Sequence, residues 1–195
     1  MTPTIPLSEL RPLIDWTYYY WAWRVKADTP EGEEVRHDAE DRLDRMMAAG
    51  GYDVRYSVVH TEAGQLTTAL GTAPCRRWLT PDYPRVGLFA ATISERMVGD
   101  IERLKSEGID DYEILLLQLV GDRLVEAASE WIGRRTGAVI RPAVGYPALP
   151  DQRFIFQMAR HLDYPATGIQ LTENGAMYPP SSVSGLLIYH PEAKY

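Results

Sequence analysis

The sequence predicts an α+β fold, a single domain in which helices flank a mixed or antiparallel sheet. Two long segments, residues 33–49 and 111–134, carry apolar residues at helical spacing. Residues 52–61 and 65–70 are strand-like and are separated by an Ala-Gly turn, which predicts an antiparallel hairpin. With 195 residues, 45% of them hydrophobic and 24% charged, the chain fits one globular domain that spans residues 1–195.

The N-terminal region is predicted to form two helices. Ser8 can cap the first, and its periodicity predicts that Tyr18 and Trp21 face inward, which leaves Tyr19, Tyr20 and Trp23 partly exposed. That exposed aromatic surface is suited to packing against a partner. Residues 33–49 form the second helix, which two glycines end. Its apolar stripe comprises Val35, Ala39, Leu43, Met46 and Met47.

The remaining elements follow the hairpin. Residues 85–91, RVGLFAA, predict a short buried strand. The long helix at 111–134 has an apolar stripe that includes Gly121, and Gly137 is its natural stop. Further helices are expected at 95–106 and 154–162, and further strands at 169–172 and 185–189.

Composition argues against several classes of protein. The net charge of −7 does not suit a general nucleic-acid binder or an anionic-membrane binder. Cys75 is the only cysteine and the four histidines are scattered, so we expect neither an intrachain disulfide nor a metal site. The sequence has no signal-peptide pattern and no apolar stretch near the roughly 20 residues that span a bilayer. A cytoplasmic location is therefore predicted.

The most informative residues lie in irregular segments of the last third of the chain. These segments are RPAVGYP (141–147), LTENGAM (171–177), SSVSG (181–185) and HPEAKY (190–195). Prolines restrict the backbone, so such a loop can hold the guanidinium of Arg141 and the phenol of Tyr146 in place for a small polar ligand. Each segment alone is also consistent with a turn and a structural arginine, but their common order and spacing are more specific.

In this order the segments resemble the C-terminal reactivation domain of cobalamin-dependent methionine synthase, the part that binds S-adenosylmethionine. Three earlier segments are also similar to this family: LIDWTYYYWAW (13–23), RVGLFAAT (85–92) and GDRLVEAASEWI (121–132). The resemblance covers most of the chain and implies an activation-domain-like fold. The chain departs from the family pattern in four places. These are Leu149 after GYPA, Asn174-Gly175 within LTENGAM, the short stretch between Gly137 and Arg141, and the stop at Tyr195.

The resemblance implies a binding site for S-adenosylmethionine. Its contacts would be Asp15, Arg141 and Tyr195, with Glu126, Tyr146 and Ala143 close by. An arginine suits the ligand carboxylate, and an aspartate or glutamate suits its ammonium group or ribose hydroxyls. Tyrosine faces suit the sulfonium. Which polar group meets which part of the ligand stays open.

Each of these residues also has a structural interpretation. Asp15 is placed to cap the aromatic helix, and Glu126 to join ion pairs on a solvated helix face. Arg141 also suits a loop ion pair, and Tyr195 a frayed end of the chain.

The resemblance further implies a role beside a corrinoid protein. The sequence contains no DxHxxG cobalamin-binding loop, so cobalamin would be carried by a separate methionine synthase core that lacks its own reactivation domain. The chain would support reductive methylation of cob(II)alamin there, with a flavodoxin-type electron donor. Asp122 resembles a family residue that contacts the displaced histidine ligand of the cobalamin module. Two alternatives are an activator of another corrinoid methyltransferase and a non-catalytic S-adenosylmethionine sensor or decayed paralogue.

Overall fold

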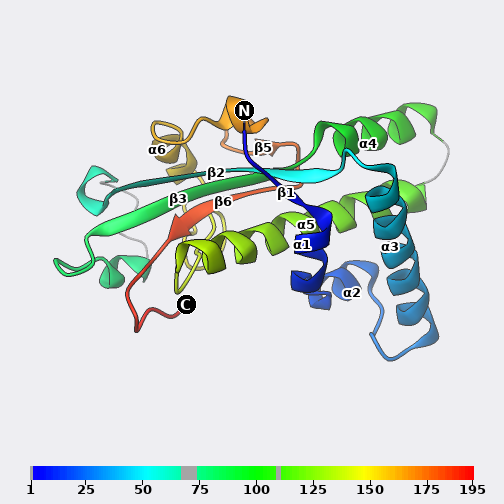
Figure 1. The fold of residues 1–195 in the computed structure, drawn as a ribbon, viewed down its shortest axis with the longest axis horizontal. Helices are drawn as coiled ribbons and strands as arrows, with labels where there is room; N and C mark the ends of the chain where they lie inside the picture. The colour runs from blue at the N-terminus through cyan, green and yellow to red at the C-terminus, as the bar shows by residue number, and fades with distance from the viewer. Residues whose placement is uncertain (1, 67–73, 109–110) are drawn as a thin grey trace.

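An antiparallel sheet of four strands forms the centre of the protein (Figure 1). The structure, a computed structural model, describes residues 2–66, 74–108 and 111–195. The strands lie in the order β1-β2-β3-β6, and they comprise Thr4–Pro6, Asp53–Glu62, Arg85–Ile93 and Ser182–Leu187. The two long strands, β2 and β3, pair from Val54 opposite Ile93 to Glu62 opposite Arg85. The α+β class and the mixed or antiparallel sheet predicted from the sequence are confirmed.

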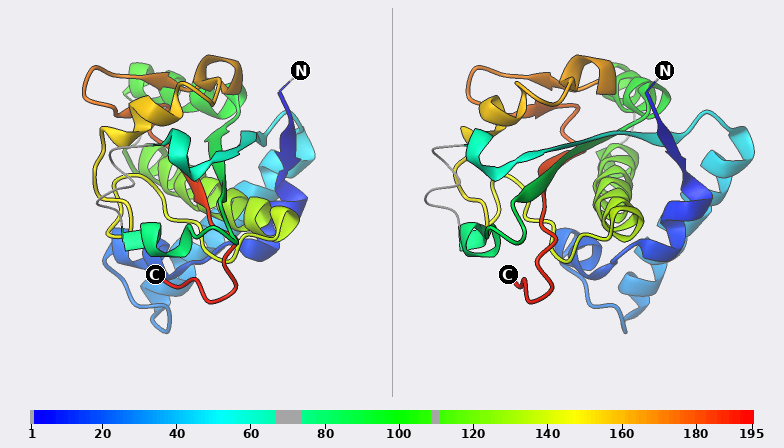
Figure 2. Two further views of the ribbon diagram at one scale, coloured as in Figure 1. Left: turned by 90° about the vertical axis from the view of Figure 1, so that its left-hand side faces the viewer. Right: turned by 60° about the vertical axis from the view of Figure 1, so that its left-hand side comes forward.

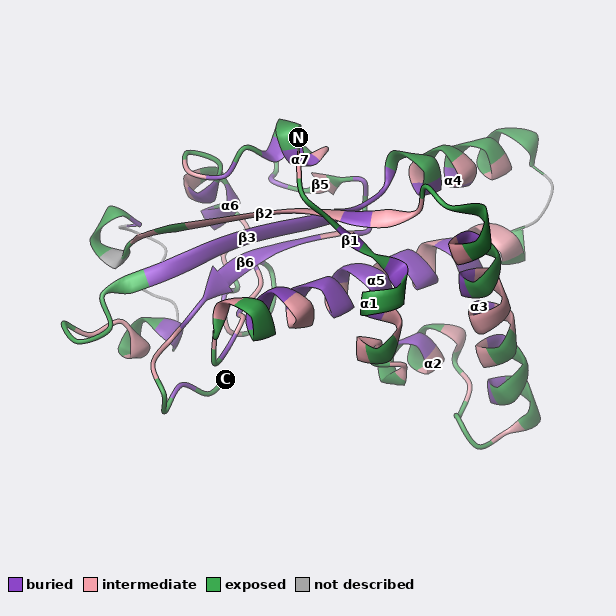
Figure 3. Ribbon diagram, in the orientation of Figure 1, coloured by how far each residue is buried: buried purple, intermediate pink, exposed green. Residues whose placement is uncertain are grey.

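The sheet separates two apolar layers. Successive residues of a strand point to opposite faces, and in β3 Phe89 packs into the layer that contains α5, whereas Leu88 packs into the layer beneath α6 and α7. Figure 2 shows α5 (Asp111–Thr136) on one side of the sheet and α6 (Phe154–Met158) and α7 (Tyr164–Thr167) on the other. Because both faces are covered, β3 and β6 are buried along most of their length (Figure 3). This burial explains the continuous apolar run in β3.

The helices begin and end at residues that the sequence marks. Thr29 caps α3 (Pro30–Ala49), and Ser94 caps α4 (Glu95–Glu107), because each hydroxyl accepts a hydrogen bond from a backbone N–H of the first turn. Gly137, at a φ of +76°, follows the end of α5, as predicted. The bounds of these three helices therefore agree with the sequence prediction to within a few residues.

The N-terminal aromatic helix differs from the prediction. Ser8 caps no long helix there. The chain instead forms α1 (Leu7–Leu10), a 3-10 turn and then α2 (Thr17–Trp23). Pro12 lies in the 3-10 turn and has no N–H to continue a helix, so the helical phase restarts at α2.

The restart reverses which aromatic residues of α2 are buried. Tyr19 is fully buried and donates a hydrogen bond to the Val35 carbonyl oxygen at 2.7 Å. Tyr18 and Trp21, predicted to face inward, are 56% and 66% exposed. The error came from extending the periodicity of the first turn across Pro12.

Two further sequence predictions need comment. The predicted return strand at 65–70 begins within a 3-10 turn that spans Ala63–Gln65, and residues 67–70 lie outside the described residues. The partner of β2 along its length is β3. The helix predicted at 154–162 ends at Met158, and a small two-stranded ribbon follows, formed by β4 (Gln170–Leu171) and β5 (Met177–Tyr178).

Candidate functional site

A cavity of about 540 Å³ lies between α5, the segment before α2, and the loop that follows α5. It brings together five of the residues singled out in the sequence, which come from four separate parts of the chain: Asp15, Glu126, Arg141, Tyr146 and Tyr195. Ala143 does not line the cavity, although it belongs to the same loop as Arg141. The rest of the cavity wall is made by Pro12, Leu13, Ile14, Tyr18, Arg123, Ala127, Ser129, Glu130 and Arg134.

The loop that carries Arg141 runs along the edge of the sheet beside β6. The Leu186 N–H donates to the Pro142 carbonyl oxygen at 2.9 Å, and the Val144 N–H donates to the Ser184 carbonyl oxygen at 2.9 Å. Ala143 forms a bridge with Gly185, where a Cβ atom would lie only 2.4 Å from the Pro142 oxygen. The sheet edge therefore sets the position of the loop, and Gly185 allows the close approach.

Arg141 reaches from this loop onto α5. Its side chain is 21% exposed and its guanidinium forms an ion pair with Glu130. The backbone N–H of Arg141 donates to the Tyr195 hydroxyl at 2.9 Å. Arg141 thus joins α5 and the last residues of the sequence to one wall of the cavity.

The two carboxylates predicted to face the ligand have different surroundings. Asp15 accepts a hydrogen bond from the Thr17 N–H at 2.9 Å, and this bond holds the pKa of Asp15 below its usual value. Asp15 therefore helps to start α2, the structural interpretation weighed for it, while it also lines the cavity. Glu126 accepts a hydrogen bond from the Tyr146 hydroxyl at 2.8 Å. Partial burial, together with the charge of Glu126, raises the pKa of the Tyr146 phenol.

Tyr195 is held in place although its side chain is 70% exposed. Ala193 is buried, and the Trp78 indole N–H donates to the Lys194 carbonyl oxygen at 3.2 Å. Together with the hydrogen bond from Arg141 to the Tyr195 hydroxyl, these contacts hold both the preceding backbone and the tip of the side chain. They favour a defined position for Tyr195 rather than a frayed end.

Sequence reasoning missed several charged residues of the cavity wall. Arg123, Glu130 and Arg134 line the cavity but were not predicted to belong to the site. The signal was present, because positions 123, 126, 130 and 134 repeat at three and four residues and so share one face of α5. The Arg123 guanidinium lies 5.5 Å from the centre of the Tyr18 ring.

These residues balance the charge of the cavity. Its wall holds three arginines and three carboxylate side chains, namely Arg123, Arg134, Arg141, Asp15, Glu126 and Glu130. Such a wall suits a ligand that carries both a carboxylate and a cationic group.

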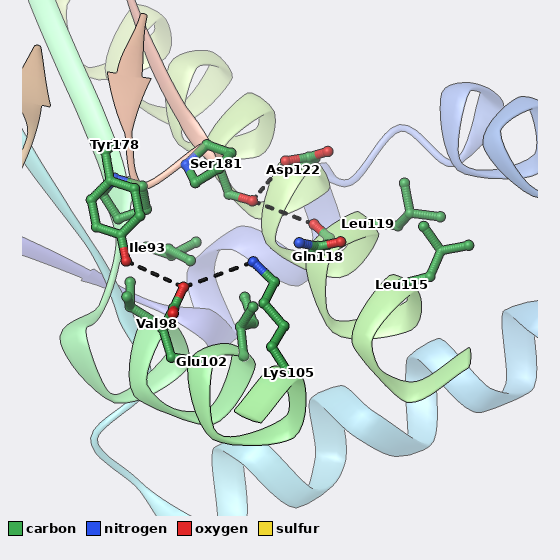
Figure 4. A pocket seen from close by; sticks show the side chains of 13 residues that line it. Ile93, Val98, Glu102, Lys105, Leu115, Gln118, Leu119, Asp122, Tyr178 and Ser181 are labelled. Carbon is green, nitrogen blue, oxygen red and sulfur yellow. Dashed lines mark hydrogen bonds and ion pairs between the residues drawn. The ribbon is translucent and has the colours of Figure 1, made fainter. Parts of the chain in front are cut away.

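Asp122 lies outside this cavity. It lines a separate cleft of about 260 Å³ between α4, α5 and the segment that leads into β6 (Figure 4). Its Oδ1 accepts a hydrogen bond from the Ser181 hydroxyl at 2.7 Å, and burial raises the pKa of its carboxyl group. At the rim of the cleft, Glu102 accepts a hydrogen bond from the Tyr178 hydroxyl at 3.3 Å and lies 3.8 Å from the Lys105 ammonium. Asp122 and the larger cavity are thus separate features of α5.

The fold is similar to that of a known protein. The solved structure described as the MetH reactivation domain bound to AdoHcy aligns with 100% of this chain and 79% of its own, with a TM-score of 0.84. The chain has the fold of a methionine synthase reactivation domain. Sequence identity to that structure is 24%, so the likeness concerns the fold. Residues 134–195 also match the family model of the vitamin B12-dependent methionine synthase activation domain. The resemblance to the reactivation domain inferred from the sequence is confirmed.

Two negative observations complete the description of this reactivation-domain fold. Within residues 2–66, 74–108 and 111–195, no helix is long and apolar enough to cross a membrane. The part of the chain that the structure describes also contains no group of three or more His, Cys, Asp or Glu side chains arranged to hold a metal ion.

Proposed function

We propose that this chain binds S-adenosylmethionine in the 540 Å³ cavity and supports reductive methylation of cob(II)alamin on a separate cobalamin-dependent methionine synthase. The observation that carries the proposal is the convergence of Asp15, Glu126, Arg141 and Tyr146 on one cavity of balanced charge. This convergence occurs in a chain with the fold of a domain that was solved with AdoHcy bound.

Five of the wall residues have a chemical counterpart in the ligand. The Arg141 guanidinium suits the carboxylate, through paired charge-assisted hydrogen bonds. Asp15 and Glu126 suit the ammonium group and the ribose hydroxyls. The faces of Tyr146 and Tyr195 suit the sulfonium. The donors and acceptors present therefore fit S-adenosylmethionine.

The chemistry asks the protein for position rather than for a catalytic acid or base. One electron from a flavodoxin-type donor and the methyl group of S-adenosylmethionine convert cob(II)alamin to methylcobalamin and leave S-adenosylhomocysteine. The cavity would hold the sulfonium methyl in one orientation toward the partner, a proximity effect that lowers the barrier. Asp122, in its separate cleft, would contact the partner protein.

Ligand binding is tested first by calorimetry with S-adenosylmethionine and S-adenosylhomocysteine. We expect dissociation constants on the order of micromolar, which corresponds to a binding free energy of about −8 kcal/mol. Arg141→Ala should weaken binding by about 2 kcal/mol, roughly 30-fold, because the ligand carboxylate loses its partner. Arg153→Ala is the matched control, because Arg153 is exposed and pairs with Asp151 away from the cavity. If calorimetry detects no heat of binding and neither ligand shifts the Tm, the proposal is refuted.

Function in trans is tested with a methionine synthase core that lacks its own reactivation domain. After oxidation to cob(II)alamin, the cobalt absorbance spectrum should return to methylcobalamin only when this chain, S-adenosylmethionine and an electron donor are all present. Asp122→Asn should slow that return while leaving S-adenosylmethionine affinity intact.

Several corrinoid partners should be compared in this assay. Restoration of another corrinoid methyltransferase, but not of methionine synthase, would reassign the partner. Persistence of cob(II)alamin with every partner, despite ligand binding, would favour an S-adenosylmethionine sensor or a decayed paralogue.

A further inference from the structure

Glu130 connects two arginines of the cavity wall. One carboxylate oxygen pairs with the Arg141 guanidinium, and the other accepts a hydrogen bond from Arg134 Nε at 2.8 Å. The Arg141 side chain is much less exposed than that of Arg134, at 21% against 65%. Both oxygens of Glu130 therefore already accept hydrogen bonds from arginines of the cavity wall.

Gly133 lies on α5, as Glu130 does, and the Arg141 side chain passes over it. A Cβ atom at Gly133 would lie 2.4 Å from Cδ of Arg141 and 2.9 Å from Nη1. Such distances are far shorter than van der Waals contact, so only glycine lets this side chain cross α5 as it does. Glycine inside a helix costs about 0.5–1 kcal/mol relative to alanine. The passage of Arg141 gives the structural reason for this unfavourable residue near the end of α5.

We propose that Glu130 and Gly133 are positioning residues for Arg141. Gly133 opens the path of the side chain across α5, and Glu130 holds one edge of the guanidinium. The remaining donors of Arg141 are then ordered before a ligand arrives, which lowers the entropy lost on binding. The inference rests on the proposed function and identifies which residues set the geometry of its carboxylate subsite.

The test compares two probes that differ in the carboxylate. S-adenosylhomocysteine carries the amino-acid group, and 5′-methylthioadenosine is a nucleoside thioether without it. Glu130→Gln and Gly133→Ala should each raise the Kd for S-adenosylhomocysteine by about tenfold, the effect of a lost well-ordered ionic partner. Neither should change the Kd for 5′-methylthioadenosine, because that probe makes no demand on Arg141.

Matched controls separate positioning from folding. Glu107→Gln removes a carboxylate that pairs with Arg103 at 3.0 Å on α4, away from the cavity. Gly99→Ala adds a methyl group where a Cβ meets nothing within 4 Å. Both controls should bind S-adenosylhomocysteine as the unaltered chain does. Because alanine favours a helix, Gly133→Ala should keep a melting temperature comparable to that of Gly99→Ala, so that its loss of affinity cannot come from unfolding.

A double-mutant cycle completes the test. In an Arg141→Ala background, Glu130→Gln should cause no further loss of S-adenosylhomocysteine affinity, since its effect passes through Arg141. Full affinity in both single variants would overturn the inference and leave the proposed function standing. Equal losses for the two probes would also overturn it, because they would indicate general damage to the wall. An unaltered chain that binds neither probe would overturn the proposed function and this inference with it.

Discussion

Replacement of Tyr195 by alanine is expected to weaken S-adenosylhomocysteine binding while leaving the fold nearly unchanged. The Tyr195 hydroxyl accepts a hydrogen bond from the Arg141 N–H at 2.9 Å, and the ring lines the cavity beside the proposed carboxylate subsite. A neutral hydrogen bond of this kind contributes about 0.5–1.5 kcal/mol, and a ring face beside the thioether of S-adenosylhomocysteine adds about 0.3–1.5 kcal/mol. We therefore expect a loss of about 1–3 kcal/mol, or about 5- to 150-fold in Kd.

The same substitution should cost the ligand-free protein little. Because the Tyr195 side chain is 70% exposed, its removal returns little apolar surface to water. Loss of the hydrogen bond from the Arg141 N–H should cost about 0.5–1 kcal/mol, which corresponds to a fall of about 1–4 °C in Tm for a domain of this size.

Calorimetry and thermal unfolding of Tyr195→Ala and Tyr195→Phe measure both effects. Tyr195→Phe keeps the ring and removes only the hydroxyl, so its Kd should lie between those of the alanine variant and the unaltered chain. Equal Kd values for all three chains would refute the reasoning and show that Tyr195 takes no part in the site. A large fall in Tm without ligand would instead identify Tyr195 as a structural residue.

Three further predictions concern other parts of the molecule. Burial raises the pKa of Asp122, so the charged form of its carboxyl group is disfavoured in the folded chain, and the stability of the fold declines as pH rises through the folded pKa. Asp122→Asn should therefore raise the Tm at pH 7, and this advantage should vanish below the unfolded pKa of about 3.9. A difference in Tm between the two chains that is constant from pH 3 to 7 would contradict the prediction. Cys75 is 2% exposed, and burial raises the pKa of its thiol. Iodoacetamide at pH 8 should therefore label Cys75 much more slowly in the native state than in guanidinium chloride. Equal labelling rates in the two conditions would disprove the burial of Cys75. Gly185→Ala should lower both the free energy of unfolding in urea and the ligand affinity, by about 1–3 kcal/mol each. The added methyl group would press on the Pro142 carbonyl oxygen and move the Arg141 loop. Unchanged values would show that the loop moves without a measurable cost.

The elements that could be predicted are those governed by neighbours along the chain. Helices α3, α4 and α5 have unbroken apolar periodicity and glycine stops, so their bounds follow from local chemistry. The buried run of β3 was equally clear. The prediction for the aromatic segment was wrong because Pro12 separates that segment from the first helical turn, and the phase of α2 then depends on the contact of Tyr19 with Val35.

The candidate site shows the same division. Asp15, Glu126, Arg141, Tyr146 and Tyr195 were found through family resemblance, and all of them line one cavity. Glu130 escaped notice although its spacing from Glu126 on α5 was visible, because an acidic residue on a helix face is usually solvated. Only the fold shows that this face is covered by the Arg141 loop.

The sequence by itself determined the chemical inventory of this protein: which groups donate, accept or carry charge, and which local segments become helix or strand. These properties depend on a residue and its near neighbours, so they survive without knowledge of the fold. The tertiary structure alone decided which of those groups meet. Arg141 reaches Glu130 because β6 holds its loop and Gly133 leaves room on α5, and Asp122 falls into another cleft although it is only four residues from Glu126. Such meetings depend on contacts between residues distant in sequence, and the packing of helices against the sheet sets them rather than any spacing along the chain.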